Sequence, residues 1–224
     1  MNVPALTIEF DPRPLERIEA DVVWICLLED ERPLRGGAGR VDWRLCGQIS
    51  ELVVAERIAG RPGEALLLPG GRTLAAPRVL ATGVGPRARY DAGAVRAACA
   101  DAARRCHALG ATRVGCGLPG FPQDAVARYA ASLLGGWLEA AREGAAPLEW
   151  RVSLSADEAP AAARALQQAV GGEASAGLTI VLPSAAEWAS RMSTEPHSGG
   201  ASARPRGVRI SRGPRPDSSG PTPP

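Results

Sequence analysis

A seven-residue apolar run, VVWICLL at residues 22–28, limits the folds open to this chain more than any other segment. A strand that covers one face of a sheet alternates apolar and polar residues, whereas a continuous apolar run is typical of a strand buried on both faces. Such strands occur in sheets that carry helices on both sides. The run therefore predicts a layered α/β domain with residues 22–28 inside the sheet.

Short apolar segments alternate with helical patterns along most of the remaining chain. Further strands are expected at residues 6–10, 65–68, 79–82, 114–118, 150–154 and 178–182. One helix is expected between the glycine-rich segment at 36–39 and Gly60, because apolar residues recur there at helical spacing, namely Val41, Leu45, Ile49, Leu52 and Val53. Three more helical patterns follow the strands at 79–82, 114–118 and 150–154, and Asp91 is the expected N-cap of the first.

The strands at 65–68 and 79–82 follow each other without a helix between them, which is typical of antiparallel neighbours. The other strands alternate with helices, a pattern typical of parallel pairing across a layered domain. The fold class that we expect is therefore α/β. The domain should have three layers, α/β/α, and a mixed sheet.

Composition excludes several kinds of chemistry. All 26 basic residues are arginine, so no P-loop lysine, Schiff-base lysine or lysine general base is available. The five cysteines form no C-x-x-C pair and are expected to be small apolar residues of a reducing compartment.

No apolar run approaches the roughly 18 residues of a membrane span, and no signal-peptide pattern opens the chain. We expect a soluble, cytoplasmic protein without a membrane partner.

A change in composition near residue 190 marks the expected end of the folded domain. From Ser190 onward Pro, Gly, Ser and Arg dominate, and apolar periodicity is lost. We expect a domain over residues 1–188 and a disordered Arg/Pro/Gly/Ser-rich tail over 189–224, which cannot bury enough surface to offset its ordering entropy. The tail is either a solubilising extension or a weak contact for an anionic partner. Nucleic acid is expected only through the tail, because the remaining body is slightly acidic.

Three segments carry a resemblance to a known family. They are ERPLRGGAGRVDWRLCGQISELV, GRPGEALLLP and RVLATGVGPRARYD. In this order and spacing they resemble the N-terminal domain of the cytosolic leucyl aminopeptidases, the M17 metallopeptidase family, over residues 21–118, with the alternating pattern extending to about residue 183. The resemblance implies a macro-domain-like α/β/α fold, which agrees with the order of strands and helices above. It also implies that a separate catalytic domain, binding two metal ions, follows in that family.

The resemblance does not bring the family's catalytic residues into this chain. In the family they lie in the C-terminal half and include an N-T-D-A-E-G-R motif and lysines, and this sequence contains neither. The densest acidic group, Glu29, Asp30 and Glu31, follows a strand, where such turns are more often solvated than metal-loaded. We therefore expect no catalytic residue, no metal site and no cofactor, and no aminopeptidase activity from this polypeptide.

Three functions are compatible with such a domain. The first is a non-catalytic interaction or regulatory module that binds another protein, such as an aminopeptidase or a neighbouring complex. The second is macro-type binding of a nucleotide or an ADP-ribose-like ligand at the glycine loops. The third is a part in a metal-dependent leucyl aminopeptidase whose catalytic half is supplied elsewhere.

Ligand binding would use seven residues, because glycines allow close backbone approach and helix N-termini present unpaired N–H groups to anions. These are Gly36, Gly37, Gly39, Arg40, Gly83, Gly85 and Arg87. Arg35 could add a further charge-assisted hydrogen bond. Two observations oppose this role: strand-to-helix turns need glycine without any ligand, and acids at Glu29 and Asp30 would repel a pyrophosphate where ligand-binding macro domains have an Asn-rich strand end.

Other conspicuous residues are assigned to packing or to the surface. Trp43, near the start of the expected helix, is expected to pack at the edge of the core. His107 follows Cys106 on a helix with no ligand at metal-binding spacing, so we expect it at the surface. No G-x-S-x-G motif is present, so the sequence offers no serine nucleophile elbow.

Overall fold

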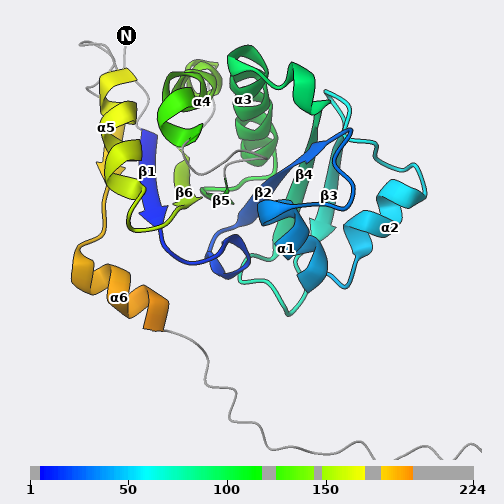
Figure 1. The fold of residues 1–224 in the computed structure, drawn as a ribbon, viewed down its shortest axis with the longest axis horizontal. Helices are drawn as coiled ribbons and strands as arrows, with labels where there is room; N and C mark the ends of the chain where they lie inside the picture. The colour runs from blue at the N-terminus through cyan, green and yellow to red at the C-terminus, as the bar shows by residue number, and fades with distance from the viewer. Residues whose placement is uncertain (1–5, 118–124, 144–147, 170–177, 194–224) are drawn as a thin grey trace, which may run out of the picture. The chain divides into compact units, whose positions relative to one another are not determined.

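A computed structural model of the chain describes residues 6–117, 125–143, 148–169 and 178–193. The seven strands of this described part form one sheet in the order β3-β4-β2-β5-β6-β1-β7 (Figure 1). They are β1 (Leu6–Asp11), β2 (Val22–Leu28), β3 (Ala65–Pro69), β4 (Arg78–Gly85), β5 (Arg113–Cys116), β6 (Glu149–Ser153) and β7 (Leu178–Val181). Strand β3 pairs antiparallel with β4, and the other neighbours are parallel. The mixed sheet and its antiparallel pair are thus confirmed.

Helices cover both faces of the sheet, as the continuous apolar run in β2 predicts (Figure 1). On one face lie α3 (Ala92–Ala108), α4 (Ala125–Arg142) and α5 (Ala159–Ala169). On the other lie α1 (Gly36–Arg44), α2 (Gln48–Val54) and the short 3₁₀ helix η1 (Leu15–Arg17). Each face has its own cluster of buried apolar side chains, and every residue of β2 is buried. The three-layer α/β/α fold is confirmed.

Three tryptophans form the centre of the larger core. The indole of Trp150, on β6, stacks on that of Trp137, on α4, with ring centroids 4.5 Å apart. Trp24, on β2, meets Trp150 edge-on at 6.0 Å, and its Nε1 donates to the hydroxyl of Thr82 at 2.9 Å. The indole N–H of Trp24 is therefore satisfied inside the core, which removes the cost of burying it.

The single helix expected up to Gly60 is in fact two helices. Between α1 and α2, Cys46 and Gly47 have positive φ angles of 55° and 83°, which an α-helix does not allow. The buried carboxylate of Asp42 then accepts hydrogen bonds from the backbone N–H groups of Ile49 (2.8 Å) and Ser50 (3.1 Å). These bonds satisfy the first turn of α2 and replace the helical bonds that the break removes.

A helix that the sequence pattern did not predict follows β7. Helix α6 spans Ala185–Ser193 and crosses the boundary expected between residues 188 and 189. The hydroxyl of Ser184 and the carboxylate of Glu187 form a reciprocal pair at its start, because the Ser184 N–H donates to Glu187 at 2.7 Å and the Glu187 N–H to Ser184 at 3.3 Å. This is a capping box. The rest of the expected tail, residues 194–224, lies outside the described residues.

Arg191 ties α6 to the carboxyl end of β1. Its guanidinium donates to the Glu9 carboxylate at 2.5 Å and lies 3.5 Å from that of Asp11. The carboxylate of Asp11 is fully buried and also accepts hydrogen bonds from the Nε and Nη2 groups of Arg13. Arg191, which its sequence surroundings assign to the tail, therefore belongs to the folded domain.

Asp21 gives the fold a predictable acid sensitivity. Its carboxylate accepts hydrogen bonds from the N–H groups of Thr112 (2.8 Å) and Arg113 (2.9 Å) and from the Thr112 hydroxyl, and these bonds lower the pKa of Asp21 to about 2. Because the folded-state pKa lies below the unfolded value, the stabilisation is complete above about pH 4 and is lost as the pH falls toward 2.

We expect Asp21→Asn to lower the free energy of unfolding by about 1 kcal/mol at pH 6, since the side chain is partly exposed and the lost bonds are charge-assisted. The difference from the wild type should narrow at pH 3, where the unfolded wild-type chain binds a proton that the folded chain still excludes. Urea unfolding at both pH values measures it. A difference that stays constant between them would contradict the prediction.

Candidate functional site

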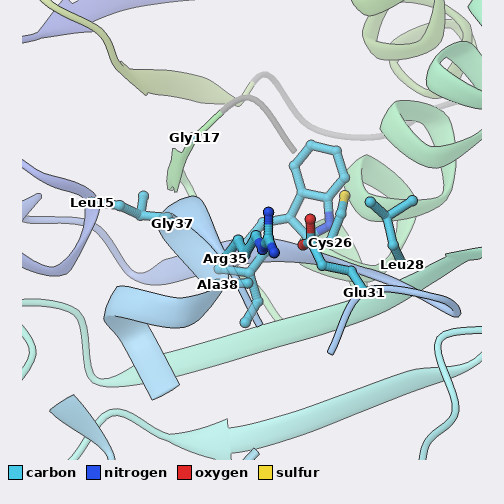
Figure 2. A pocket seen from close by; sticks show the side chains of 10 residues that line it. Leu15, Cys26, Leu28, Glu31, Arg35, Gly37, Ala38 and Gly117 are labelled. Atoms are coloured by element: carbon cyan, nitrogen blue, oxygen red, sulfur yellow. The ribbon is translucent and has the colours of Figure 1, made fainter. Parts of the chain in front are cut away.

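The carboxyl ends of the parallel strands all lie along the same border of the sheet, and open α/β sheets bind ligands at these carboxyl ends. The N-terminus of α1 lies beside the ends of β2 and β5 at this edge. Between them is a small cavity of about 20 Å³, lined by residues that include Cys26, Leu28, Glu31 and Arg35 (Figure 2). That volume accepts about one water molecule. It is far below the roughly 300 Å³ of a pocket for a small organic ligand.

A larger groove of about 410 Å³ lies next to this cavity, and we call it the edge groove. It is lined by Pro12, Pro14, Gly36, Gly37, Arg40, Gly117, Ser153, Leu154, Ser155 and Glu158. Helix α1 has no side-chain N-cap, and the N–H groups of Gly36, Gly37 and Ala38 have no acceptor among the described residues. The edge groove therefore offers free backbone donors to an anion.

The α1 glycines lie where the sequence places them, but only two of them reach the edge groove. Gly36 opens the helix with a φ of 56°, and Gly37 is next to it. Gly39 faces the preceding loop instead, because a Cβ there would lie 2.5 Å from the carbonyl oxygen of Leu34. Gly39 is thus explained by close packing of loop and helix, without a ligand.

Gly83 and Gly85 do not form the loop that the sequence predicts, because β4 continues through both. Their N–H groups donate to the carbonyl oxygens of Glu64 (2.9 Å) and Gly60 (2.8 Å). A Cβ at Gly83 would lie 2.1 Å from the carbonyl oxygen of Arg61, so the chain crossing at residues 60–64 requires glycine there. These N–H groups are occupied, and neither glycine lines the edge groove or the cavity.

The acidic turn after β2 is paired with arginines and not simply solvated. The guanidinium of Arg87 binds the carboxylate of Glu31, and the backbone N–H of Arg87 donates to Asp30 at 2.9 Å. The guanidinium of Arg61 lies 3.6 Å from Glu29. This pairing weakens the repulsion that the acids would exert on an anion. It also occupies Arg87, which the sequence assigns to the ligand.

The two remaining arginines at this edge differ in their partners. Arg35 lines the small cavity near Glu31, and its side chain has no hydrogen bond or ion pair with any residue in the described part of the chain (Figure 2). The Nε of Arg40 lies 3.3 Å from the carboxylate of Glu16, so its charge is partly compensated. Of the predicted set, Gly36, Gly37 and Arg40 share one groove, with Arg35 beside it.

Neither a metal centre nor a membrane segment is found within the described ranges. No three His, Cys, Asp or Glu side chains there are arranged to hold a metal ion. No helix among them is both long enough and apolar enough to span a bilayer. Four of the five cysteines are buried and unpaired, and burial raises the pKa of Cys106 to about 12, which keeps it a thiol. Cys46 is the exception, because it is exposed.

The break between α1 and α2 creates a second hollow, which the sequence did not predict. This elbow groove, of about 610 Å³, is lined by Pro33, Leu34, Gly39, Asp42, Trp43, Arg44, Cys46, Gly47, Ser50 and Thr73. Trp43 was expected to pack at the edge of the core, but 73% of its surface is exposed. Val41 and Asp42 are buried on the inner side of α1, and the helical rotation turns the next residue outward.

Most polar side chains of the elbow groove form hydrogen bonds with other residues of the groove. The hydroxyl of Ser50 donates to Asp42 at 2.5 Å, and that of Thr73 donates to the carbonyl oxygen of Arg44 at 2.8 Å. The guanidinium of Arg44 lies over the indole of Trp43, 5.1 Å from the ring centroid. The Nε of Arg44 is buried and has no hydrogen-bond partner among the residues that the structure describes. Exposed Cys46 completes the rim.

The fold is a three-layer α/β/α fold with a mixed sheet, similar to that of macrodomains. The model of the cytosol aminopeptidase family, N-terminal domain, matches residues 22–143. The chain therefore belongs to this family. No curated protein sequence matches it.

Solved structures with a similar fold come from two groups of proteins. A leucine aminopeptidase variant from tomato matches with a TM-score of 0.56 and 15% identity, over 76% of this chain and 37% of that one. The Oceanobacillus iheyensis macrodomain with ADP has a TM-score of 0.58 and 14% identity, over 75% and 94%. The Trypanosoma brucei macrodomain in complex with ADP has a TM-score of 0.54 and 18% identity, over 75% and 69%. The chain thus spans little more than a third of the tomato enzyme.

Proposed function

We propose that this domain is a non-catalytic interaction module that binds a segment of another protein in the elbow groove. The observation that carries the proposal is Trp43, which is 73% exposed at the rim of a groove of about 610 Å³. Tryptophan is enriched among the residues that dominate the binding energy of protein interfaces. The groove also has apolar walls at Pro33 and Leu34, so a partner side chain placed there would leave water for an apolar site.

Removal of Trp43 tests this proposal. Tagged wild-type protein and Trp43→Ala would be used to capture partners from the source organism, with Val181→Ala as the matched control. Val181 is a 38% exposed apolar residue on β7, the strand at the opposite edge of the sheet from β3. A partner retained by wild type and by Val181→Ala, and lost with Trp43→Ala, is the expected result. A partner held equally by all three would contradict the proposal.

Cys46 supplies an independent readout on the same groove. It is the only exposed cysteine of the five, so alkylation of the native protein should modify it first. Addition of the purified partner should slow that alkylation several-fold, because the partner covers the rim. An unchanged rate at saturating partner would place the interaction elsewhere on the molecule.

A second candidate function is binding of a phosphate-bearing ligand in the edge groove. It is favoured by the uncapped N-terminus of α1, which supports anion binding, and by Arg35, whose side chain has no partner among the described residues. Macrodomains of the same fold have been solved with ADP. Glu158 in the lining and Glu16 beside Arg40 disfavour an anion, so this candidate ranks second.

Calorimetry with ADP-ribose tests the second candidate. We expect weak binding in the wild type, and a loss of about tenfold with Arg35→Gln, as is typical when one charged hydrogen bond is removed. Arg57→Gln, a change of the same charge at an exposed site outside the edge groove, should have no effect. No heat at millimolar ligand would eliminate this function.

Family membership suggests an aminopeptidase catalytic domain as one partner, while the chain itself is expected not to hydrolyse leucyl substrates. The described residues contain no cluster that could hold the two metal ions such hydrolysis uses. Purified protein with leucine p-nitroanilide and added Mn²⁺ or Zn²⁺ should therefore give the buffer rate. Metal-dependent turnover that co-purifies with the protein would overturn this expectation.

A further inference from the structure

We infer that the elbow groove selects segments that carry a carboxylate beside an apolar side chain. The inference rests on the proposed interaction function and specifies the chemistry of the partner. It follows from the two charged side chains that line the groove, Asp42 and Arg44. The carboxylate of Asp42 is hydrogen-bonded within the domain, whereas the guanidinium of Arg44 has no counter-charge among the described residues.

Asp42 supplies the satisfied charge. Both of its carboxylate oxygens are occupied, Oδ1 by the N–H groups of Ile49 and Ser50 and Oδ2 by the Ser50 hydroxyl. These are the bonds that begin α2, so the negative charge faces a helix N-terminus, where it is stabilised. Asp42 is buried and already accepts three hydrogen bonds, so it offers little to a partner's cation, and a cationic segment is disfavoured.

Arg44 supplies the unsatisfied charge. Within the described ranges its guanidinium forms no ion pair, and its Nε is buried without a hydrogen-bond partner. A half-buried guanidinium without a counter-charge gains free energy when an anionic acceptor binds its accessible N–H groups. A carboxylate is the acceptor that matches a guanidinium in charge and in shape.

Contacts in the free domain already orient Arg44. The Thr73 hydroxyl holds its backbone by donating to its carbonyl oxygen at 2.8 Å, and the Trp43 ring holds its guanidinium, whose Cζ lies 5.1 Å from the ring centroid. A partner would therefore lose little free energy in ordering this side chain. The exposed indole beside the cation and the apolar wall at Leu34 add the second requirement, an apolar side chain close to the carboxylate.

A carboxylate suits this site better than a phosphate. Phosphate sites usually combine several cations or free backbone N–H groups. The elbow groove has one arginine, and the first N–H groups of α2 are already bound to Asp42. One guanidinium can satisfy one carboxylate through two parallel hydrogen bonds.

Selection of phage-displayed random heptapeptides against the full chain tests the inference. We expect enrichment of Asp or Glu within two positions of an aromatic or branched aliphatic residue. A synthetic peptide from that set should slow alkylation of Cys46, which lies on the rim. Replacing its acid by the corresponding amide should weaken binding about tenfold, the usual effect of losing a charged hydrogen bond.

Variants of the protein separate this inference from the proposed function. Arg44→Gln should weaken the acidic peptide about tenfold and leave its amide counterpart unchanged, whereas Arg57→Gln should change neither. Circular dichroism would show that both variants remain folded. Peptides that lack an acid and depend on Trp43 but not on Arg44 would overturn the inference and leave the interaction function intact. Failure to select any peptide would overturn both the inference and the proposed interaction function. Selected peptides whose binding is unchanged by Trp43→Ala and by Arg44→Gln would do the same.

Discussion

Gly136→Ala is expected to lower the free energy of unfolding by about 3 kcal/mol, while the neighbouring Gly135→Ala leaves it unchanged or raises it slightly. Both glycines lie in α4, which packs against α3. A Cβ at Gly136 would lie 2.3 Å from the carbonyl oxygen of Arg96 and 2.7 Å from the Cβ of Cys99. These atoms belong to α3 and cannot move without shifting the helix, so the two helices must separate.

Gly135 is the matched control because it is one residue away in the same helix. A Cβ there would lie 3.5 Å from the guanidinium of Arg96, the mobile end of a long side chain that can move aside. Alanine is favoured over glycine inside a helix by up to about 1 kcal/mol, so this variant gains stability if it changes at all. Urea unfolding followed by tryptophan fluorescence measures both variants. Equal midpoints for the two would show that the close approach of α3 and α4 does not require glycine.

The layers of this fold could be predicted from the sequence because they depend on patterns that lie close together in the chain. The run at residues 22–28 matches β2 residue for residue, since a strand buried on both faces requires apolar residues at every position. The antiparallel pair β3 and β4 was also predicted, because the segment between them is too short for a helix. Asp91 was identified as an N-cap, and it accepts a hydrogen bond from the N–H of Ala94.

The failures of prediction arise where distant contacts decide the local structure. The apolar spacing from Val41 to Val53 does predict the buried side, but it cannot show that the Asp42 side chain will cap a second helix. Gly47 was the available signal for that break. Helix α6 was missed because Arg191 owes its place to Glu9, which lies 182 residues earlier in the chain. Composition places the same arginine in a tail.

The candidate sites divide in the same way. The glycine-rich start of α1 could be predicted because the signal is a local strand-to-helix turn. Gly83 and Gly85 were misplaced because the crossing segment at 60–64 extends the hydrogen bonding of β4 beyond its apolar part. The elbow groove could not be predicted from the sequence. The exposure of Trp43 depends on where α1 ends and on which side of α1 carries Asp42.

Trp150→Ala should cost about 3–5 kcal/mol, the largest single-residue effect that we expect in this domain. Trp150 is completely buried, stacks on Trp137 at 4.5 Å and meets Trp24 edge-on at 6.0 Å. Truncation removes both ring contacts and leaves a cavity between β6 and α4, where the packed neighbours prevent collapse. Because domains of this size are stable by about 5–15 kcal/mol, a large part of the folded population would be lost on mild heating.

Trp43→Ala provides the control, because it removes the same side chain from a position that is 73% exposed and should change stability by less than about 0.5 kcal/mol. Guanidinium unfolding followed by far-UV circular dichroism compares the two variants without relying on tryptophan fluorescence. Trp150→Phe should recover about half of the loss, since an aromatic ring of smaller volume keeps part of the stack on Trp137. A Trp150→Ala midpoint equal to that of Trp43→Ala would mean that the sheet does not depend on its buried tryptophan cluster. In that case the stability of the domain would have to come mainly from the aliphatic residues of β2 and α3. Gly136→Ala would then lower the free energy of unfolding more than Trp150→Ala does.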